Sequence, residues 1–287
     1  MTQALPLPKF DAHEPDDYPA ELYTAVGTAK TVCGFDAVGQ EQIRQYHDEG
    51  YIVIEQAFNA EEVQEMIAGL NALVMGQYPD FTNIEFEWHT KEKLATLSTE
   101  ERQDAVRKLM GFVKFEPRLN AIAQHPRLIL LLRELLGSEP KLFQDMTLFK
   151  PPHIGREKPW HQDHAYFNLP QGTHVVGVWI ALDAATLDNG CMRLLPGQHK
   201  AGARPHFQRR DWQICDADIL GQECVAAPIA PGGCLIFNGL LPHGTPHNLS
   251  AARRRAVQYH YHGTGIVQTT TEERLEIFGG EGTDVSC

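Results

Sequence analysis

The chain has 287 residues, of which 43% are hydrophobic and 22% charged, which is enough to bury a complete barrel or sandwich core in one main domain. Its formal charge of −12, together with a longest basic run of only three residues (Arg253-Arg254-Arg255), argues against nucleic acid as a partner. We recognise no signal peptide, bilayer-spanning segment or Cys-x-x-Cys pair, so we expect a cytosolic protein with reduced thiols and no membrane partner.

The first part of the chain combines a turn-rich arm with the start of a helical region. Residues 1–36 have no periodic pattern and are expected to lie over the surface. Residues 40–49 predict a short helix that ends at Gly50, and the apolar run 51–54 has the length of a strand.

Two more helices are expected before residue 140. Asn59 and Glu62 form a capping box in front of an amphipathic segment, whose apolar face should pack against a sheet. Residues 126–136 predict a buried helix that begins with proline and ends at a glycine. Between them, residues 75–107 are weakly patterned, which is typical of a loop with a short helix.

From about residue 141 the pattern changes to short strands that are rich in β-branched and aromatic residues and separated by Gly, Pro, Asn and Asp. The expected strands are 142–149, 175–182, 192–195, 234–237 and 256–262. Their succession without clear intervening helices predicts a mainly β fold, a double-stranded β-helix (a cupin-like jelly roll) flanked by N-terminal α-helices. We therefore divide the chain into an N-terminal arm (1–36), one domain (37–265) with helical support (37–140) and a jelly-roll core (141–265), and a C-terminal tail (266–287).

A His-x-Asp pair at the start of the strand region is a candidate metal site. Residues two apart in an extended segment point to the same side, so His161 and Asp163 can reach one ion. Two histidines and one carboxylate leave positions of iron(II) open for a cosubstrate and dioxygen. His47 and Glu49 have the same spacing, but on a predicted helix their side chains diverge, and His47 is expected on the surface.

The third ligand and a cosubstrate contact are expected further along the chain. His243 follows the apolar strand 234–237, and Arg254 comes eleven residues later. A planar guanidinium that faces into the same barrel can bind a carboxylate through two hydrogen bonds. Arg253 and Arg255 remain alternatives, because a one-residue change of register reverses the inward face.

Residues from about 142 to 262 resemble the phytanoyl-CoA dioxygenase family of iron(II)/2-oxoglutarate oxygenases. The resemblance is carried by ordered motifs: Pro159-Trp160-His161-Gln162-Asp163, Asp188-Asn189-Gly190-Cys191, Leu195-Pro196-Gly197-Gln198-His199 and His243-Gly244-Thr245-Pro246-His247-Asn248-Leu249-Ser250, followed by Arg254.

The resemblance implies roles for individual residues. His161, Asp163 and His243 would bind iron, and Arg254 would pair with the distal carboxylate of 2-oxoglutarate. The resemblance also implies cosubstrate contacts at Thr245, Trp179, Gln144, Met146 and Lys114.

The implied activity is a 2-oxoglutarate-dependent dioxygenase that uses iron(II) and dioxygen, hydroxylates an unactivated C–H bond of a small organic molecule and releases succinate and carbon dioxide. Asp163 favours hydroxylation over halogenation, since related halogenases replace this carboxylate with a small residue. A cupin-like metalloenzyme without an oxo acid and a non-catalytic metal-binding sensor remain alternatives. His260 and His262 are expected to pack or to support the ligands, whereas Trp160, Tyr166 and Phe167 could either line a substrate cavity or fill the roll.

Overall fold

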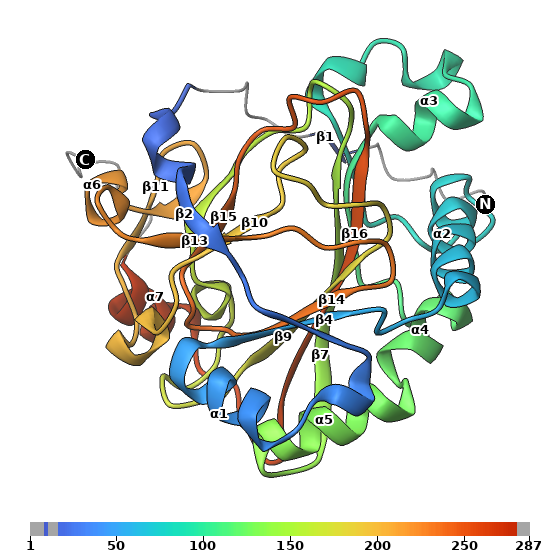
Figure 1. Ribbon diagram of the computed structural model, residues 1–287. Helices are drawn as coiled ribbons and strands as arrows, with labels where there is room; N and C mark the ends of the chain where they lie inside the picture. The colour runs from blue at the N-terminus through green and yellow to red at the C-terminus, as the bar shows by residue number, and fades with distance from the viewer. Residues whose placement is uncertain (1–8, 11–16, 280–287) are drawn as a thin grey trace.

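The computed structural model describes residues 9–10 and 17–279, and it contains two facing β-sheets with helices on the outer side of the larger one (Figure 1). The large sheet has nine strands. In spatial order they are β1 (Lys9–Phe10), β5 (Ile84–Phe86), β6 (Val106–Met110), β7 (Pro140–Lys150), β16 (Arg254–Gly263), β9 (Val176–Ala181), β14 (Cys234–Asn238), β4 (Tyr51–Glu55) and β3 (Thr31–Cys33).

The small sheet has five strands and faces the large one. Its order is β2 (Ala25–Thr28), β13 (Cys224–Ala227), β10 (Met192–Leu194), β15 (His243–Thr245) and β8 (Lys158–His161). A separate hairpin is formed by β11 (His206–Gln208) and β12 (Trp212–Ile214). The predicted jelly roll with helical support is confirmed.

The helices are α1 (Gln40–Glu49), α2 (Ala60–Val74), α3 (Thr99–Asp104), α4 (Pro117–Ala123), α5 (Pro126–Leu136), α6 (Asp216–Ile219) and α7 (Thr271–Phe278). The predicted helices at 40–49 and 126–136 are confirmed. Asn59 caps α2 by accepting a hydrogen bond from the Glu62 backbone N–H, while the Glu62 carboxylate accepts one from Asn59.

Alternation along the central strands separates two cores. On β14, Ile236 packs with the apolar faces of α2 and α5, while Leu235 and Phe237 point into the space between the two sheets. The helices thus cover one face of the large sheet, and the other face is left for the interior of the roll.

Three segments differ from the sequence expectations. The described part of the arm contributes β2 and β3, which pair in parallel with β13 and β4 at the sheet edges. The weakly patterned region 75–107 contains β5 and the start of β6, which pairs with β5 and β7. The tail contains α7, which packs on the roll through Phe278.

In the part of the chain that the structure describes, no helix is long and apolar enough to cross a membrane. Cys33, Cys191, Cys224 and Cys234 are free thiols, as expected. The expectation was wrong at Cys215, which is disulfide-bonded. The cytosolic location stays a prediction.

Candidate metal centre

Three buried side chains converge between the two sheets. His161 ends β8, Asp163 follows two residues later, and His243 opens β15 directly opposite His161 in the antiparallel pair. His161 Nε2 lies 3.1 Å and His243 Nε2 lies 3.6 Å from Asp163 Oδ1. Among the described residues this is the one group of at least three such donors that could hold a metal ion.

Backbone carbonyls fix the orientation of both histidines. His161 Nδ1 lies 2.7 Å from the Pro159 carbonyl oxygen, and His243 Nδ1 lies 2.9 Å from that of Leu241. Each Nδ1 therefore carries the proton, and each Nε2 has a lone pair available to a metal. Burial lowers the pKa of His243 to about 4, so this imidazole is neutral at pH 7.

The carboxylate of Asp163 is held ionised inside the roll. Burial alone would raise its pKa, but the neighbouring His243 and His260 and its hydrogen bonds hold that pKa well below the usual range. Two neutral imidazoles and one carboxylate on one side of a site form the donor set that non-haem iron(II) oxygenases use. The residues present therefore fit iron(II).

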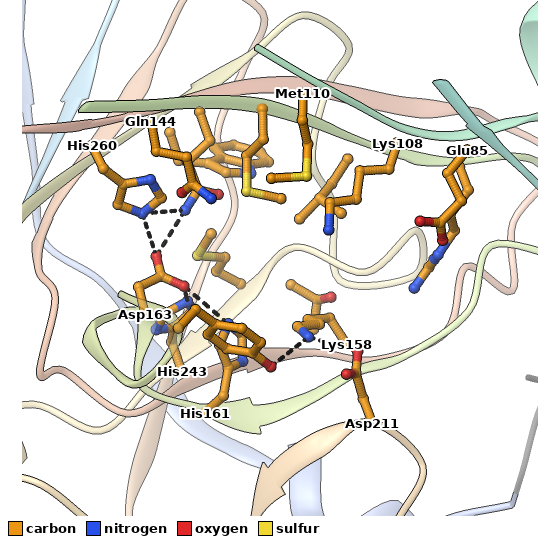
Figure 2. Close-up of a pocket in the computed structure, with 18 of the residues that line it drawn as sticks. Glu85, Lys108, Met110, Gln144, Lys158, His161, Asp163, Asp211, His243 and His260 are labelled. Atoms are coloured by element: carbon orange, nitrogen blue, oxygen red, sulfur yellow. Dashed lines mark hydrogen bonds and ion pairs between the residues drawn. The ribbon is translucent and has the colours of Figure 1, made fainter. Parts of the chain in front are cut away.

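The three donors open into a cavity of about 490 Å³ between the sheets (Figure 2). Its opposite wall is the inner face of the large sheet. One row of this wall runs across four strands in register and consists of Met110, Met146, Gln258 and Trp179. The next row has small residues at its β16 and β9 positions, Ala256 and Ala181, which pack in the apolar cluster between the two sheets.

Arg254 lies in the same cavity with no acidic partner among the described residues. Its side chain is 1% exposed, and its guanidinium carbon lies 5.4 Å from the centre of the Trp179 ring. Within the described part of the chain, the Nε and Nη1 atoms of Arg254 and the hydroxyl of Thr245 have no hydrogen-bond partner. Burial lowers the pKa of Arg254 to about 10, so it stays charged at pH 7. A buried cation beside a free hydroxyl fits a carboxylate of 2-oxoglutarate.

The neighbouring arginines point elsewhere. Arg255 pairs with Asp183 at 2.8 Å on the other side of β16, and Arg253 pairs with Asp104 at 3.1 Å. Alternation along the strand therefore leaves Arg254 as the arginine of this run that faces the cavity.

The structure brings most of the expected cosubstrate contacts together, with one exception. Trp179, Gln144 and Met146 line the cavity, as do Tyr166 and Phe167, whereas Trp160 packs in a separate core cluster. Lys114 is exposed in the segment after β6 and is not among the residues that line the cavity, so a cosubstrate contact at Lys114 stays a prediction. Lys108, on β6, lines the cavity instead.

The sequence did not reveal Lys108 or Gln258. Both positions follow from the alternation of side chains once the strands are known. Lys108 lies two residues before Met110 and on the same face of β6. Gln258 and His260 lie four and six residues after Arg254, on the same inward face of β16. His260 supports a ligand, as expected, through a contact of 2.8 Å with Asp163 Oδ2. His262 contacts the Gly263 carbonyl oxygen.

Comparisons with known proteins agree with this geometry. The family model described as phytanoyl-CoA dioxygenase matches residues 46–256. Phytanoyl-CoA dioxygenase domain-containing protein 1 of Danio rerio is 23% identical over 262 residues, covering 78% of this chain and 90% of that protein. A probable alpha-ketoglutarate-dependent hypophosphite dioxygenase of Stutzerimonas stutzeri is 27% identical over 229 residues, covering 75% of each.

Solved structures show the same fold. EctD from S. alaskensis with bound Fe has a TM-score of 0.66 at 21% identity and covers 94% of this chain and 92% of that chain. The carbocyclase SnoK from nogalamycin biosynthesis, described as non-heme and alpha ketoglutarate dependent, has a TM-score of 0.64 at 20% identity and covers 87% and 93%.

Proposed function

The chain belongs to the phytanoyl-CoA dioxygenase family and is a non-haem iron(II)- and 2-oxoglutarate-dependent dioxygenase, and from this premise we propose that it hydroxylates an unactivated C–H bond of a small organic molecule. We assign iron binding to His161, Asp163 and His243, and binding of the distal carboxylate of 2-oxoglutarate to Arg254 with Thr245. The observation that carries the proposal is the buried, unpaired Arg254 in the cavity into which the three metal donors open.

Bound iron(II), 2-oxoglutarate and dioxygen would together supply the oxidising chemistry, with succinate and carbon dioxide as the products of the oxo acid. The protein's part is to bind and to orient. His161 and His243 each offer an Nε2 lone pair, and Asp163 offers a negative charge. The Trp179 ring packs beside Arg254 and limits where a carboxylate can lie.

We further propose that Lys108 makes the upstream cosubstrate contact that the resemblance had suggested for Lys114. Lys108 extends from β6 into the cavity (Figure 2), and no ion pair or hydrogen bond to another described residue occupies its ammonium group. Lys158, the other lysine of the cavity, is already paired with Asp211 at 2.6 Å and with the Tyr166 hydroxyl at 2.9 Å. Burial and Lys158 lower the pKa of Lys108, and the carboxylates of Glu85 and Asp211 raise it without forming an ion pair with the ammonium group. An ammonium group that makes no ion pair favours an anion in the cavity.

The test uses the visible charge-transfer band that forms when iron(II) and 2-oxoglutarate bind together without oxygen. The wild type should show the band and release succinate in air. Arg254→Ala should raise the apparent KM for 2-oxoglutarate at least about tenfold, because a charged hydrogen bond contributes about 1.5–3 kcal/mol. Arg253→Ala is the matched control, since Arg253 pairs with Asp104 outside the cavity, and its KM should match the wild type.

A wild type that binds iron but shows neither the band nor succinate release would refute the oxygenase assignment. That result would favour a metalloenzyme of this fold that uses no oxo acid, whereas an unchanged KM in Arg254→Ala would refute the role of Arg254 in binding 2-oxoglutarate.

A further inference from the structure

The two oxygens of the Asp163 carboxylate have different surroundings. Oδ1 faces the two histidines, 3.1 Å from His161 Nε2 and 3.6 Å from His243 Nε2. Oδ2 faces the opposite wall and lies 2.8 Å from Gln258 Nε2 and 2.8 Å from His260 Nε2. Figure 2 shows the contact between Asp163 and His260. One oxygen is therefore directed at the metal site, and the other is held by two side chains of β16.

The chemistry of the carboxylate fixes the direction of these hydrogen bonds. An ionised carboxylate only accepts, so the amide of Gln258 and the Nε2–H of His260 must both donate to Oδ2. Gln258 Nε2 and His260 Nε2 then lie 3.0 Å apart because both donate to the same oxygen, and not because one donates to the other.

The two donors come from a rigid part of the roll. Gln258 and His260 are 3% and 1% exposed and sit in the middle of β16, which is paired on both sides, with β7 and β9. The His260 ring is packed by aromatic rings, with ring-centroid distances of 4.9 Å to Phe167, 6.1 Å to Phe143 and 6.4 Å to Phe237. Asp163 follows β8 of the small sheet, so these hydrogen bonds join the two sheets across the cavity.

We propose that Gln258 and His260 are positioning residues that hold Oδ2 away from the metal, so that Asp163 ligates through Oδ1 alone. A carboxylate can bind a metal through one oxygen or through both, and binding through both would occupy a position that the cosubstrate or dioxygen needs. This inference rests on the proposed function, because it requires the metal to bind at His161, Asp163 and His243.

The experiment is an anaerobic titration of the metal-free protein with cobalt(II), whose absorption bands report coordination number as well as affinity. Gln258→Leu and His260→Leu each remove one donor at similar volume. Each should weaken cobalt binding about tenfold or more, within the 10–100-fold range typical of residues that support metal ligands, and should change the visible bands of the complex. His260→Gln retains a donor and should recover most of the affinity and the wild-type spectrum.

His262→Leu is the matched control. His262 is also a buried histidine on β16, but it contacts the Gly263 carbonyl oxygen and not Asp163. Its cobalt affinity and spectrum should match the wild type. If circular dichroism shows that a leucine variant is not folded, Gln258→Asn is used in its place. The asparagine side chain is one methylene shorter, so this variant should bind cobalt more weakly than the wild type.

The outcomes separate the two proposals. A wild type that does not bind cobalt refutes the metal site itself. A wild type that binds cobalt, with Gln258 and His260 variants of equal affinity and unchanged spectra, overturns the positioning role and leaves the metal site standing.

Discussion

At the scale of single residues, the cavity is defined by polar groups that have no partner among the residues that the structure describes. Arg254 and Thr245 both have buried polar atoms without hydrogen bonds, and leaving such groups unpaired costs stability. A fold retains them where a ligand completes the contacts. The same reasoning distinguishes Lys108, which faces the cavity without a partner, from Lys158, which is paired with Asp211.

Lys108→Gln should therefore raise the apparent KM for 2-oxoglutarate about tenfold, because the variant loses one charge-assisted contact of about 1.4 kcal/mol. Succinate release measured against 2-oxoglutarate concentration checks this. Lys114→Gln changes the same charge at an exposed position and should leave KM unchanged. If the Lys114 variant were the weaker binder, the proposal that Lys108 makes this contact would be refuted, and the contact would be assigned to Lys114.

His174 gives a pH dependence of stability that does not involve the metal site. Burial, with His47 and His199 nearby, lowers the pKa of His174 from 6.5 to about 4, and its Nε2 lies 2.8 Å from the Tyr46 hydroxyl. Between those pH values the unfolded chain binds a proton that the folded protein rejects. The free energy of unfolding should therefore fall as pH decreases from about 6.5 to about 4.

Urea unfolding of the metal-free protein at pH 7.5 and pH 5 measures this effect. In His174→Gln the loss of stability between the two pH values should be smaller than in the wild type. An equal loss in both proteins would assign the acid sensitivity to other buried histidines, such as His206, whose pKa is lowered to about 3.

At the scale of elements, the sequence revealed the ligand motifs but not the short strands β8 and β15 that carry His161 and His243, nor the pairing that builds the cavity wall. His161, Asp163, His243 and Arg254 lie in short motifs that can be read directly. The position of Lys108 depends on the pairing of β6 with β7, and the position of Gln258 depends on the pairing of β7 with β16. Both pairings join segments that are far apart in the chain. Local patterns do not encode such neighbours, which is why the lysine contact was expected at Lys114.

The helix α7 shows a signal that was present in the sequence and not used. Thr270 and Glu273 form a capping box at its start, which is an N-terminal signature. The surface on which α7 packs could not be predicted, because it is formed by the residues directly after the ligand Asp163 and by β11, which are far from α7 in the sequence. Phe278 packs against His164 and His206, and the Arg274 side chain donates to the Ala165 carbonyl oxygen.

Phe278→Ala should destabilise the protein by about 3–5 kcal/mol, because it removes a buried ring and leaves a cavity. Chemical denaturation measured by circular dichroism checks this. Val267→Ala is the control in the segment before α7: Val267 is 78% exposed, so its substitution should change stability by less than about 0.5 kcal/mol. A small effect at Phe278 would mean that α7 is not part of the folded core.

At the scale of the whole molecule, packing and chemistry occupy opposite faces of the large sheet. The larger core cluster lies between that sheet and the helices and includes Met66, Leu132 and Ile236. The metal donors lie on the other side, between the two sheets. The fold does not need the metal to bring its helices and sheets together, because its main apolar core is closed without it.

Removing the metal should therefore leave the protein folded and only lower its stability. A ligand that binds the folded state adds RT ln(1 + [L]/Kd), about 2.7 kcal/mol when the free metal is about one hundred times its Kd. The Tm should rise steadily with the logarithm of metal concentration, while the far-ultraviolet spectrum of the chelated protein stays that of the loaded one. Unfolding on chelation alone would show instead that the buried donors His161, Asp163 and His243 cannot be held together without the ion, and that the metal belongs to the folding core of this protein.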